Sequence, residues 1–343
     1  MPLMRNLLLL TTALGVAAWA PDRFYVPGVA FELKPDYGLA SIYFANGTSV
    51  PVAQIQGRPG YQAFMRRATP PPATSPSTLC SYLTPELQIL ASTLRLQVDF
   101  CESADVSSTK ALLTSLKTAV ESYLGTNICF AELGLFETGN YVDPPRYQVN
   151  ITKEALRAIG LRQTQDPRSA STYAVSAHMA VDGRLNDAVI FAVDYSVYGF
   201  SFGLYTTEEG IFELVAREQY HYAPTPAPLA NAVANPDEDE PTHLATLRTH
   251  LRDFLVDQPV QIEHLVLYGD RAQHAALRPL LASVLNADLV RNAHISRSVF
   301  AGTTLMAKSA YESMDTPDLR VDAAFGCRWR SKLYRPDPDQ KEL

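Results

Sequence analysis

The sequence predicts an α/β protein built from two successive halves. Runs with strand character are followed by runs with helical character in each half, an order typical of α/β architecture. Hydrophobic residues make up 47% and charged residues 19% of the 343-residue chain, as in ordinary globular proteins. About 320 residues remain after an N-terminal leader, enough for two cores. We expect one lobe over residues 21–180, a second over residues 181–315, and a C-terminal tail over residues 316–343.

The first 20 residues have the three parts of a secretory signal peptide. Arg5 supplies the positive charge, residues 7–18 are apolar, and Ala18-Trp19-Ala20 fits the A-x-A cleavage pattern. The apolar run is short for a bilayer span. We therefore expect cleavage before Pro21 and a secreted or luminal protein; an uncleaved signal anchor is the alternative.

Two glycosylation sequons agree with this route. They are Asn46-Gly47-Thr48 and Asn150-Ile151-Thr152, so Asn46 and Asn150 are the candidate glycan sites.

The four cysteines, Cys80, Cys101, Cys129 and Cys327, allow two disulfides in an oxidising compartment, with three connectivities. Their wide, irregular spacing argues against a zinc site. We expect a bond between Cys80 and Cys101, which flank one predicted helix. Cys129 lies in an apolar run and is expected to be a buried free thiol.

The first half predicts a hairpin, three helices and a further strand. Residues 29–44 and 50–56 alternate as strands around Asn46-Gly47, a hairpin signal. Helices are expected over residues 84–96, 107–124 and 152–161, with a strand over 127–136. Gly125 ends the second helix, and Thr152 is the expected N-cap of the third.

The second half predicts the same kinds of element. Strands are expected over residues 188–204, 211–222 and 262–268, and helices over residues 242–256, 272–285 and 299–311. Proline-rich segments at 66–78 and 224–241 are expected to be exposed loops.

One hairpin carries the clearest chemical signal. The apolar run from Phe191 reaches Asp194, turns, and continues as alternating apolar and small residues. An acid at such a turn can face a phosphate or a metal ion, or it can cap the turn through its own side chain. The expected turn, residues 195–198, contains no glycine to let the backbone approach an anion.

In the order of these segments the chain resembles the actin-like ATPase superfamily, which has a two-lobed, ribonuclease H-like fold. The resemblance is nearest to the nucleotide-binding domain of heat-shock chaperones and to secreted or reticulum-directed fungal relatives of it. It covers roughly residues 29–312. The resembling segments are residues 31–57 (first phosphate hairpin), 127–136 (next strand), 154–175 (helix and acidic turn), 191–205 (second phosphate hairpin), 264–281 (adenosine strand, turn and helix) and 299–308 (closing helix).

The resemblance implies a degenerate nucleotide site. Asp166 and Asp194 fall at catalytic positions of the family. The implied nucleotide-binding positions are Glu32, Lys34, Gly269, Asp270 and Gly302. The outer subdomain is expected to be reduced, because the stretch from residue 194 to 269 is short for the family.

Several residues depart from the family pattern. Lys34, Pro35 and Asp36 replace a glycine and two small hydroxyl residues, and Asp270 replaces a glycine. A side chain in a left-handed turn costs roughly 1–2 kcal/mol. Lys34 is expected to be a solvated loop lysine, with a point-charge substitute for the lost phosphate grip as the alternative.

A second motif, Gly199-Phe200-Ser201-Phe202-Gly203, matches the nucleophile-elbow pattern G-x-S-x-G. The elbow requires a helix after the serine, whereas a strand is expected here. The seven histidines form no H-E-x-x-H motif, and His243 and His250 are expected on a helix surface.

Three functions follow as hypotheses. The first is a secreted, non-catalytic protein with a binding or structural role and no cofactor. The second is a retained ATPase of the secretory pathway that binds ATP with magnesium ion. The third is a serine hydrolase using Ser201. A net charge of −7 without a basic block argues against nucleic acid as a partner, and no membrane span is expected, which leaves a protein partner.

Overall fold

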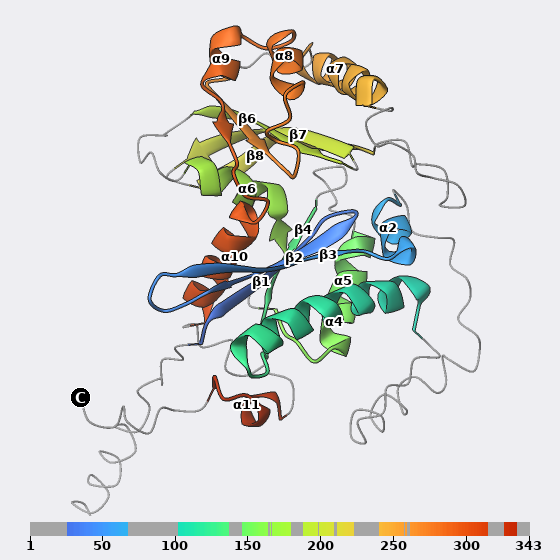
Figure 1. The fold of residues 1–343 in the computed structure, drawn as a ribbon, viewed down its shortest axis with the longest axis vertical. Coiled ribbons are helices and arrows are strands. Elements are labelled where there is room, and N and C mark those ends of the chain that lie inside the picture. Colours follow the sequence, from blue (N-terminus) through green and yellow to red (C-terminus); the bar gives the residue numbers. More distant parts are fainter. Residues whose placement is uncertain are drawn as a thin grey trace, which may run out of the picture.

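The computed structural model describes residues 26–67, 102–136, 146–163, 165, 167–179, 188–197, 199–208, 211–222, 240–256, 258, 261–314 and 326–334. These residues form a mixed α/β protein with two five-stranded mixed sheets, which confirms the predicted α/β class (Figure 1). The signal peptide, the helix predicted over residues 84–96, Cys80, Cys101, Asp166 and most of both proline-rich loops lie outside the described residues. In the described part of the chain, no helix has the length and apolar character needed to cross a membrane.

The first sheet combines two antiparallel hairpins with parallel strands. Its order is β3-β2-β1-β4-β5. Strands β1, β2 and β3 are antiparallel, and β4 and β5 join β1 in parallel. Its strands are β1 (Gly28–Leu33), β2 (Tyr37–Tyr43), β3 (Ser49–Gln56), β4 (Glu132–Leu135) and β5 (Arg168–Ser169).

The second sheet repeats this arrangement. Its order is β10-β9-β6-β7-β8, so both sheets read 3-2-1-4-5 when their strands are numbered along the chain. Strands β6, β7 and β8 are antiparallel, and β9 and β10 are parallel additions next to β6. Its strands are β6 (Val189–Ser196), β7 (Gly199–Glu208), β8 (Ile211–Tyr222), β9 (His264–Tyr268) and β10 (His294–Ile295).

Helices cover both sheets. The described helices are α2 (Pro59–Met65), α4 (Ala104–Leu124), α5 (Arg146–Ala158), α6 (Ala170–Met179), α7 (Glu240–Val256), α8 (Leu277–Ala282), α9 (Ala287–Arg291), α10 (Ala301–Ser313) and α11 (Cys327–Arg330). Helix α4 has a sequence signal at each end. The Ser103 hydroxyl accepts a hydrogen bond from the Val106 amide at 3.1 Å, and Gly125 ends the helix in the left-handed conformation, φ 65°.

Side chains on neighbouring strand positions face opposite layers. In β6, Phe191 and Val193 pack in the core beneath α7 and α8, whereas Ile190 and Ala192 pack against α6. In β1, Phe31 packs in the core with α4 and α5, whereas Ala30 faces α10. The strands are apolar on both faces because both faces are covered.

Helices α6 and α10 are exchanged between the sheets. Helix α6 follows β5 of the first sheet, but it packs against β8 and β9 of the second. Helix α10 follows β10 of the second sheet, but it packs against β1, β2 and β4 of the first. The two helices also contact each other, and they lie between the sheets in Figure 1. A Cβ on Gly28 would overlap the Ala307 carbonyl oxygen of α10, so this close packing requires glycine.

Two helix predictions were wrong in detail. Thr152 is not an N-cap, because α5 begins at Arg146 and the Thr152 hydroxyl donates to the Gln148 carbonyl at 2.7 Å inside the helix. The helix predicted over residues 272–285 is limited to α8, since Pro279 is compatible only with the first turn of a helix.

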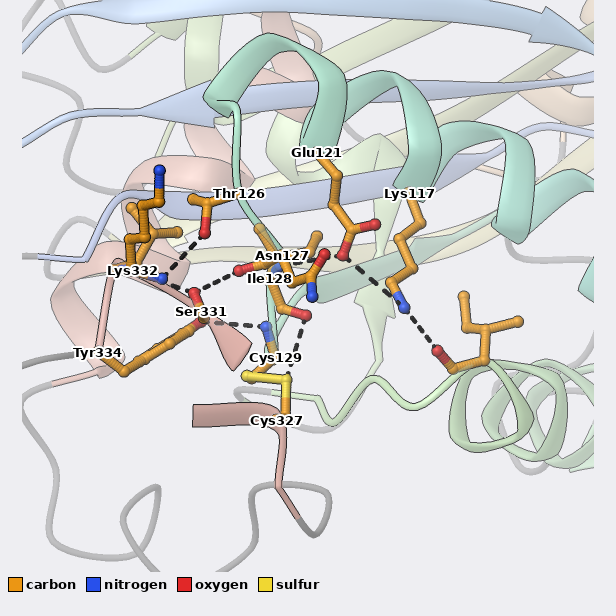
Figure 2. The surroundings of a disulfide bond; sticks show 12 residues. Lys117, Glu121, Thr126, Asn127, Ile128, Cys129, Cys327, Ser331, Lys332 and Tyr334 are labelled. Carbon is orange, nitrogen blue, oxygen red and sulfur yellow. Dashed lines mark hydrogen bonds and ion pairs between the residues drawn. A yellow bond between two sulfur atoms is a disulfide. The ribbon is translucent and has the colours of Figure 1, made fainter. Parts of the chain in front are cut away.

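A disulfide joins Cys129 to Cys327, with 5.8 Å between the Cα atoms (Figure 2). The expectation that Cys129 is a free thiol was therefore wrong. Its apolar surroundings were anticipated, but the partner lies 198 residues further along the chain. The bond holds the segment 326–334 against the start of the strand region that contains β4.

Candidate functional site between the two sheets

Predicted site residues meet between the sheets, at the ends of β1, β6 and β9. Glu32, Lys34, Gly269 and Gly302 line one small cavity, and Tyr268 and His178 line it with them. Glu32 lies on the same face of β1 as Ala30, and Asp194 on the same face of β6 as Ala192, so both carboxylates point toward the layer of exchanged helices. Asp166 lies outside the described residues.

Lys34 is the centre of this site. Its ammonium nitrogen lies 2.5 Å from Asp194 Oδ2 and 3.3 Å from Glu32 Oε1. The three side chains are only 6%, 3% and 2% exposed, in the order Lys34, Asp194, Glu32. The interpretation of Lys34 as a solvated loop lysine is therefore wrong. Lys34 and Asp194 are far apart in the sequence, so their pairing cannot be predicted from the pattern of either segment.

Electrostatics favour the ionised lysine. Burial alone would lower the pKa of Lys34, but the carboxylates of Asp194 and Glu32 reverse this effect and hold it well above its ordinary value. The Tyr268 ring, with its centroid 5.2 Å from the ammonium nitrogen, adds a cation–π contact.

The Glu32 carboxylate contacts both Lys34 and helix α10. Burial raises its pKa, although Lys34 and the Thr303 hydroxyl, which donates to Oε2 at 2.5 Å, offset part of the rise. Thr303 belongs to α10, so the exchanged helix also contributes to the site. Sequence reasoning missed it, although a threonine directly after Gly302 in an apolar helix is a usable signal.

Asp194 is not the residue that caps its hairpin. It lies within β6, paired in register with Ser201 of β7 and Tyr268 of β9, and the turn follows at Val197. The cap comes instead from Asp270, whose Oδ1 accepts a hydrogen bond from the Val197 amide at 3.1 Å. Asp194 forms an ion pair with Lys34 through Oδ2. Its Oδ1 atom is buried and has no hydrogen bond among the described residues.

Helix α2 and Gly57, which precedes it, hold the turn that carries Lys34. The Tyr61 hydroxyl donates to the Lys34 carbonyl at 2.7 Å, and the Gly57 amide donates to the Asp36 carbonyl at 2.7 Å. The buried Asp36 carboxylate pairs with Arg66. These bonds fix the backbone of the turn, and the Lys34 side chain extends from it to Asp194 of the second sheet.

Gly269 brings β9 close to β6. Its φ is +100°, and a Cβ there would overlap the Tyr195 carbonyl oxygen and Asp194 Oδ1. The position therefore requires glycine twice, for its backbone conformation and for its contact with Asp194.

The cavity between these residues measures about 10 Å³. That is about the space needed by one water molecule, whereas ligand pockets generally measure some 300–1,000 Å³. This cavity, as the described residues form it, is therefore much smaller than a nucleotide, and the Lys34 ammonium group lies next to it. Among the described residues, no group of three or more His, Cys, Asp or Glu side chains is placed to hold a metal ion.

Ser201 and the histidines are placed elsewhere. Ser201 is fully buried in β7, between β6 and β8, so a strand and not a helix follows it. His243 is also buried, at 6% exposure, which contradicts its predicted surface position. Its ring lies 5.3 Å from that of Phe200, in the core of the second sheet.

The chain matches no family model, and no curated protein matches it. Its function is therefore argued from the geometry of the site.

Proposed function

We propose that this protein is a secreted, non-catalytic relative of the actin-like ATPases, a pseudo-ATPase whose fold serves a binding or structural role. The observation that carries the proposal is the buried Lys34 ammonium group, paired with Asp194 and Glu32 between the two hairpins. A lysine in this position supplies the positive charge that would otherwise have to come with a ligand.

The duplicated architecture supports the actin-like part of the proposal. Both sheets have the strand order 3-2-1-4-5, and each is covered on its inner face by a helix from the other half. The resemblance of residues 29–312 implies two lobes, and a repeated sheet in each half is compatible with that expectation. Under this proposal the two lobes hold each other through α6, α10 and the Lys34 ion pair.

The size and charge of the site support the loss of catalysis. A nucleotide would have to displace Lys34 from two buried carboxylates and open a cavity of about 10 Å³. It would also bring its phosphates toward Asp270, whose pKa is raised chiefly by burial. Separating a buried ion pair costs several kcal/mol, and each 1.4 kcal/mol weakens binding tenfold.

One observation favours the alternative, a retained ATP-binding protein of the secretory pathway. Gly269 keeps the positive φ of a glycine turn directly beside Asp194, at the position that the resemblance assigns to the adenosine turn. Such a protein would need the lobes to separate and Lys34 to leave Asp194 before ATP and magnesium ion bind. The serine-hydrolase hypothesis has no comparable support, because Ser201 lies in the middle of a sheet.

The deciding experiment is calorimetric titration of ATP, with and without magnesium ion, into the secreted glycosylated protein. Asp194→Ala is titrated alongside, and Asp288→Ala provides a control because Asp288 is an exposed carboxylate that does not line the cavity. We expect no binding tighter than about 1 mM in any of the three proteins. Magnesium-dependent binding tighter than about 10 μM that is lost only in Asp194→Ala would overturn the proposal in favour of the ATP-binding alternative.

A further inference from the structure

Residues 326–334, which we name the C-terminal clasp, are anchored to the first half of the chain. The clasp is bonded through Cys327 to Cys129, and the Tyr334 hydroxyl accepts from the Cys129 amide at 3.2 Å (Figure 2). The Ser331 hydroxyl donates to the Asn127 carbonyl, and the Lys332 amide donates to the Thr126 hydroxyl at 2.9 Å. These contacts fix the backbone of the clasp before it meets any partner.

The outer side of the clasp is aromatic and basic. Trp329 is 82% exposed, although Cys327 and Tyr334 of the same segment are buried. Arg330 and Lys332, one and three positions further along the chain, are also exposed, and no acidic residue occurs between positions 326 and 334. On a chain with a net charge of −7, this is a local reversal of charge.

Arg328, unlike Arg330 and Lys332, packs against an aromatic ring of the first half of the chain. Its guanidinium carbon lies 5.8 Å from the centroid of the Phe130 ring, and Phe130 in turn packs edge-on against Tyr334. Arg328 therefore stabilises the clasp, whereas Trp329, Arg330 and Lys332 remain available. Figure 1 places α11, which carries Trp329, at the end of the molecule remote from α7, α8 and α9.

We propose that the face formed by Trp329, Arg330 and Lys332 is the docking site for an acidic peptide segment of a protein partner. The inference rests on the binding role proposed above and names the partner by its chemistry. Tryptophan and arginine are the residues most enriched at interface hot spots, and a face that is fixed in advance loses little entropy on binding. Carboxylates of the partner pair with Arg330 and Lys332, and an apolar side chain or backbone segment covers the indole.

A membrane surface fits the same face less well. Two basic residues and one tryptophan offer an anionic bilayer only a weak attraction that is not directed at any one group. A peptide can instead form directed ion pairs with both basic residues while it covers the ring. The charge complementarity therefore favours an acidic peptide.

The chain is suited to a direct test. It contains two tryptophans, and the expected cleavage before Pro21 removes Trp19, so the fluorescence of the mature secreted protein reports on Trp329 of the clasp alone. The probe is an acetylated octaglutamate peptide carrying a C-terminal leucine, titrated at low salt. We expect saturable quenching or a blue shift of Trp329 emission, and binding at least about tenfold weaker in Arg330→Ser/Lys332→Ser.

Matched controls separate this face from general attraction. The variant Arg291→Ser/Lys308→Ser removes two other exposed cations, whose side chains are 74% and 47% exposed, and it should bind the peptide as the parent does. Fluorescein-labelled octaglutamate anisotropy extends the test to Trp329→Ala, which should also lose about tenfold. Circular dichroism melting checks that all variants are folded.

Three results would overturn the proposal: no saturable change up to 1 mM peptide, an equal loss in the control variant, or tighter binding to phosphatidylserine-containing vesicles than to the peptide. The last would assign the face to a membrane surface. ATP binding in the calorimetric experiment would overturn the proposed pseudo-ATPase and leave these fluorescence results unaffected, so the two failures can be told apart.

Discussion

Lys34 and Asp194 form a 2.5 Å ion pair across the space between the two sheets, although 160 residues separate them in the chain. Replacing the lysine by an isosteric apolar residue leaves two buried carboxylates without their cation. We therefore expect Lys34→Met to lower the free energy of unfolding by about 3–5 kcal/mol, measured by urea titration.

The partner variant completes a double-mutant cycle. Asp194→Asn alone should also destabilise, whereas Lys34→Met/Asp194→Asn should recover at least about 1 kcal/mol relative to the sum of the single changes. Exposed Lys308 and Glu312 provide the matched pair for comparison, with an expected coupling of about 0.5 kcal/mol or less. Additive effects at Lys34 and Asp194 would mean that the ion pair does not form in solution.

Because α10 packs closely on β1, we expect that Gly28 cannot be replaced by a larger residue without loss of stability. In Gly28→Ala the new methyl group would overlap the Ala307 carbonyl and the Tyr311 amide, both of which are backbone atoms that cannot rotate away. We expect a loss of at least about 3 kcal/mol or failure to fold, measured by thermal melting. Gly60→Ala is the control, since it lies in helix α2 with only ordinary contact to Ser108; it should be neutral or slightly stabilising. Equal melting temperatures for the two variants would contradict the position of α10.

The disulfide closes a loop between residues 198 positions apart. Loop-closure entropy for such a length corresponds to about 5 kcal/mol, and measured effects are commonly 2–5 kcal/mol. The double variant Cys129→Ala/Cys327→Ala should therefore lose about 2–5 kcal/mol of stability in guanidinium titration. Because the bond anchors the clasp, limited proteolysis should also cut the variant faster within residues 326–334. An unchanged digestion pattern would show that the hydrogen bonds alone hold the clasp.

His221 predicts a loss of stability in acid. Burial, and to a smaller extent the neighbouring His250, lowers its pKa from 6.5 to about 4. The two rings stack with centroids 3.6 Å apart. The unfolded chain binds a proton at His221 below about pH 6.5 and the folded chain only near pH 4, so stability falls as the pH falls between these values. Because the ring is partly open to solvent, we expect a loss of about 1–2 kcal/mol from this group.

The pH test compares two histidine variants by urea unfolding at pH 7, 5.5 and 4.5. His221→Phe keeps the stacking with Phe200 but cannot titrate, so its stability should fall less steeply with acid than that of the parent. His264→Phe, in β9 of the same sheet, is the matched control substitution. The hypothesis fails if His221→Phe retains the full slope.

The sequons differ in accessibility. Asn46 and Thr48 are both exposed at the β2–β3 turn, whereas Thr152 is fully buried inside α5 next to the exposed Asn150. We expect glycan on Asn46, so Asn46→Gln should remove the glycosidase-sensitive mobility shift and Asn150→Gln should leave it. The reverse pattern would indicate that Asn150 is modified before α5 folds.

Much of the architecture could be predicted from local patterns. Strands β1 and β6 are nearly continuous apolar runs, and α4 has both its Ser103 cap and Gly125 in the sequence. The prediction of one helix over residues 272–285 was wrong at its start. The apolar residues have helical spacing, but the first residues of the segment form a turn before α8. The Arg271 amide donates to the Tyr195 carbonyl at 3.0 Å, which holds the chain in a turn before α8 begins. That carbonyl belongs to another strand and has no local signature.

Some residues of the cluster around Lys34 can be grouped from the sequence, but their contacts cannot. Glu32 and Lys34 are two positions apart, so a strand reading places them on one face, and two charges there already mark an unusual strand end. What no segment reveals is that Asp194 arrives opposite Lys34, because this depends on how the two sheets are held together by α6 and α10. The burial of Lys34 is thus a property of the whole fold, as is the bond between Cys129 and Cys327.

The exchange of α6 and α10 also constrains how the chain is made. The first sheet is complete once β5 has left the ribosome, yet the helix that covers the inner face of β1 and β2 follows about 130 residues later. At a rate of synthesis of 5–20 residues per second, α10 is made roughly 6–26 seconds after the first sheet. During this interval an apolar surface is open to whatever is nearby. The N-terminal half therefore completes its packing only after α10 has been made, and a chain that ends before Ala301 would leave this face of the first sheet without its helix.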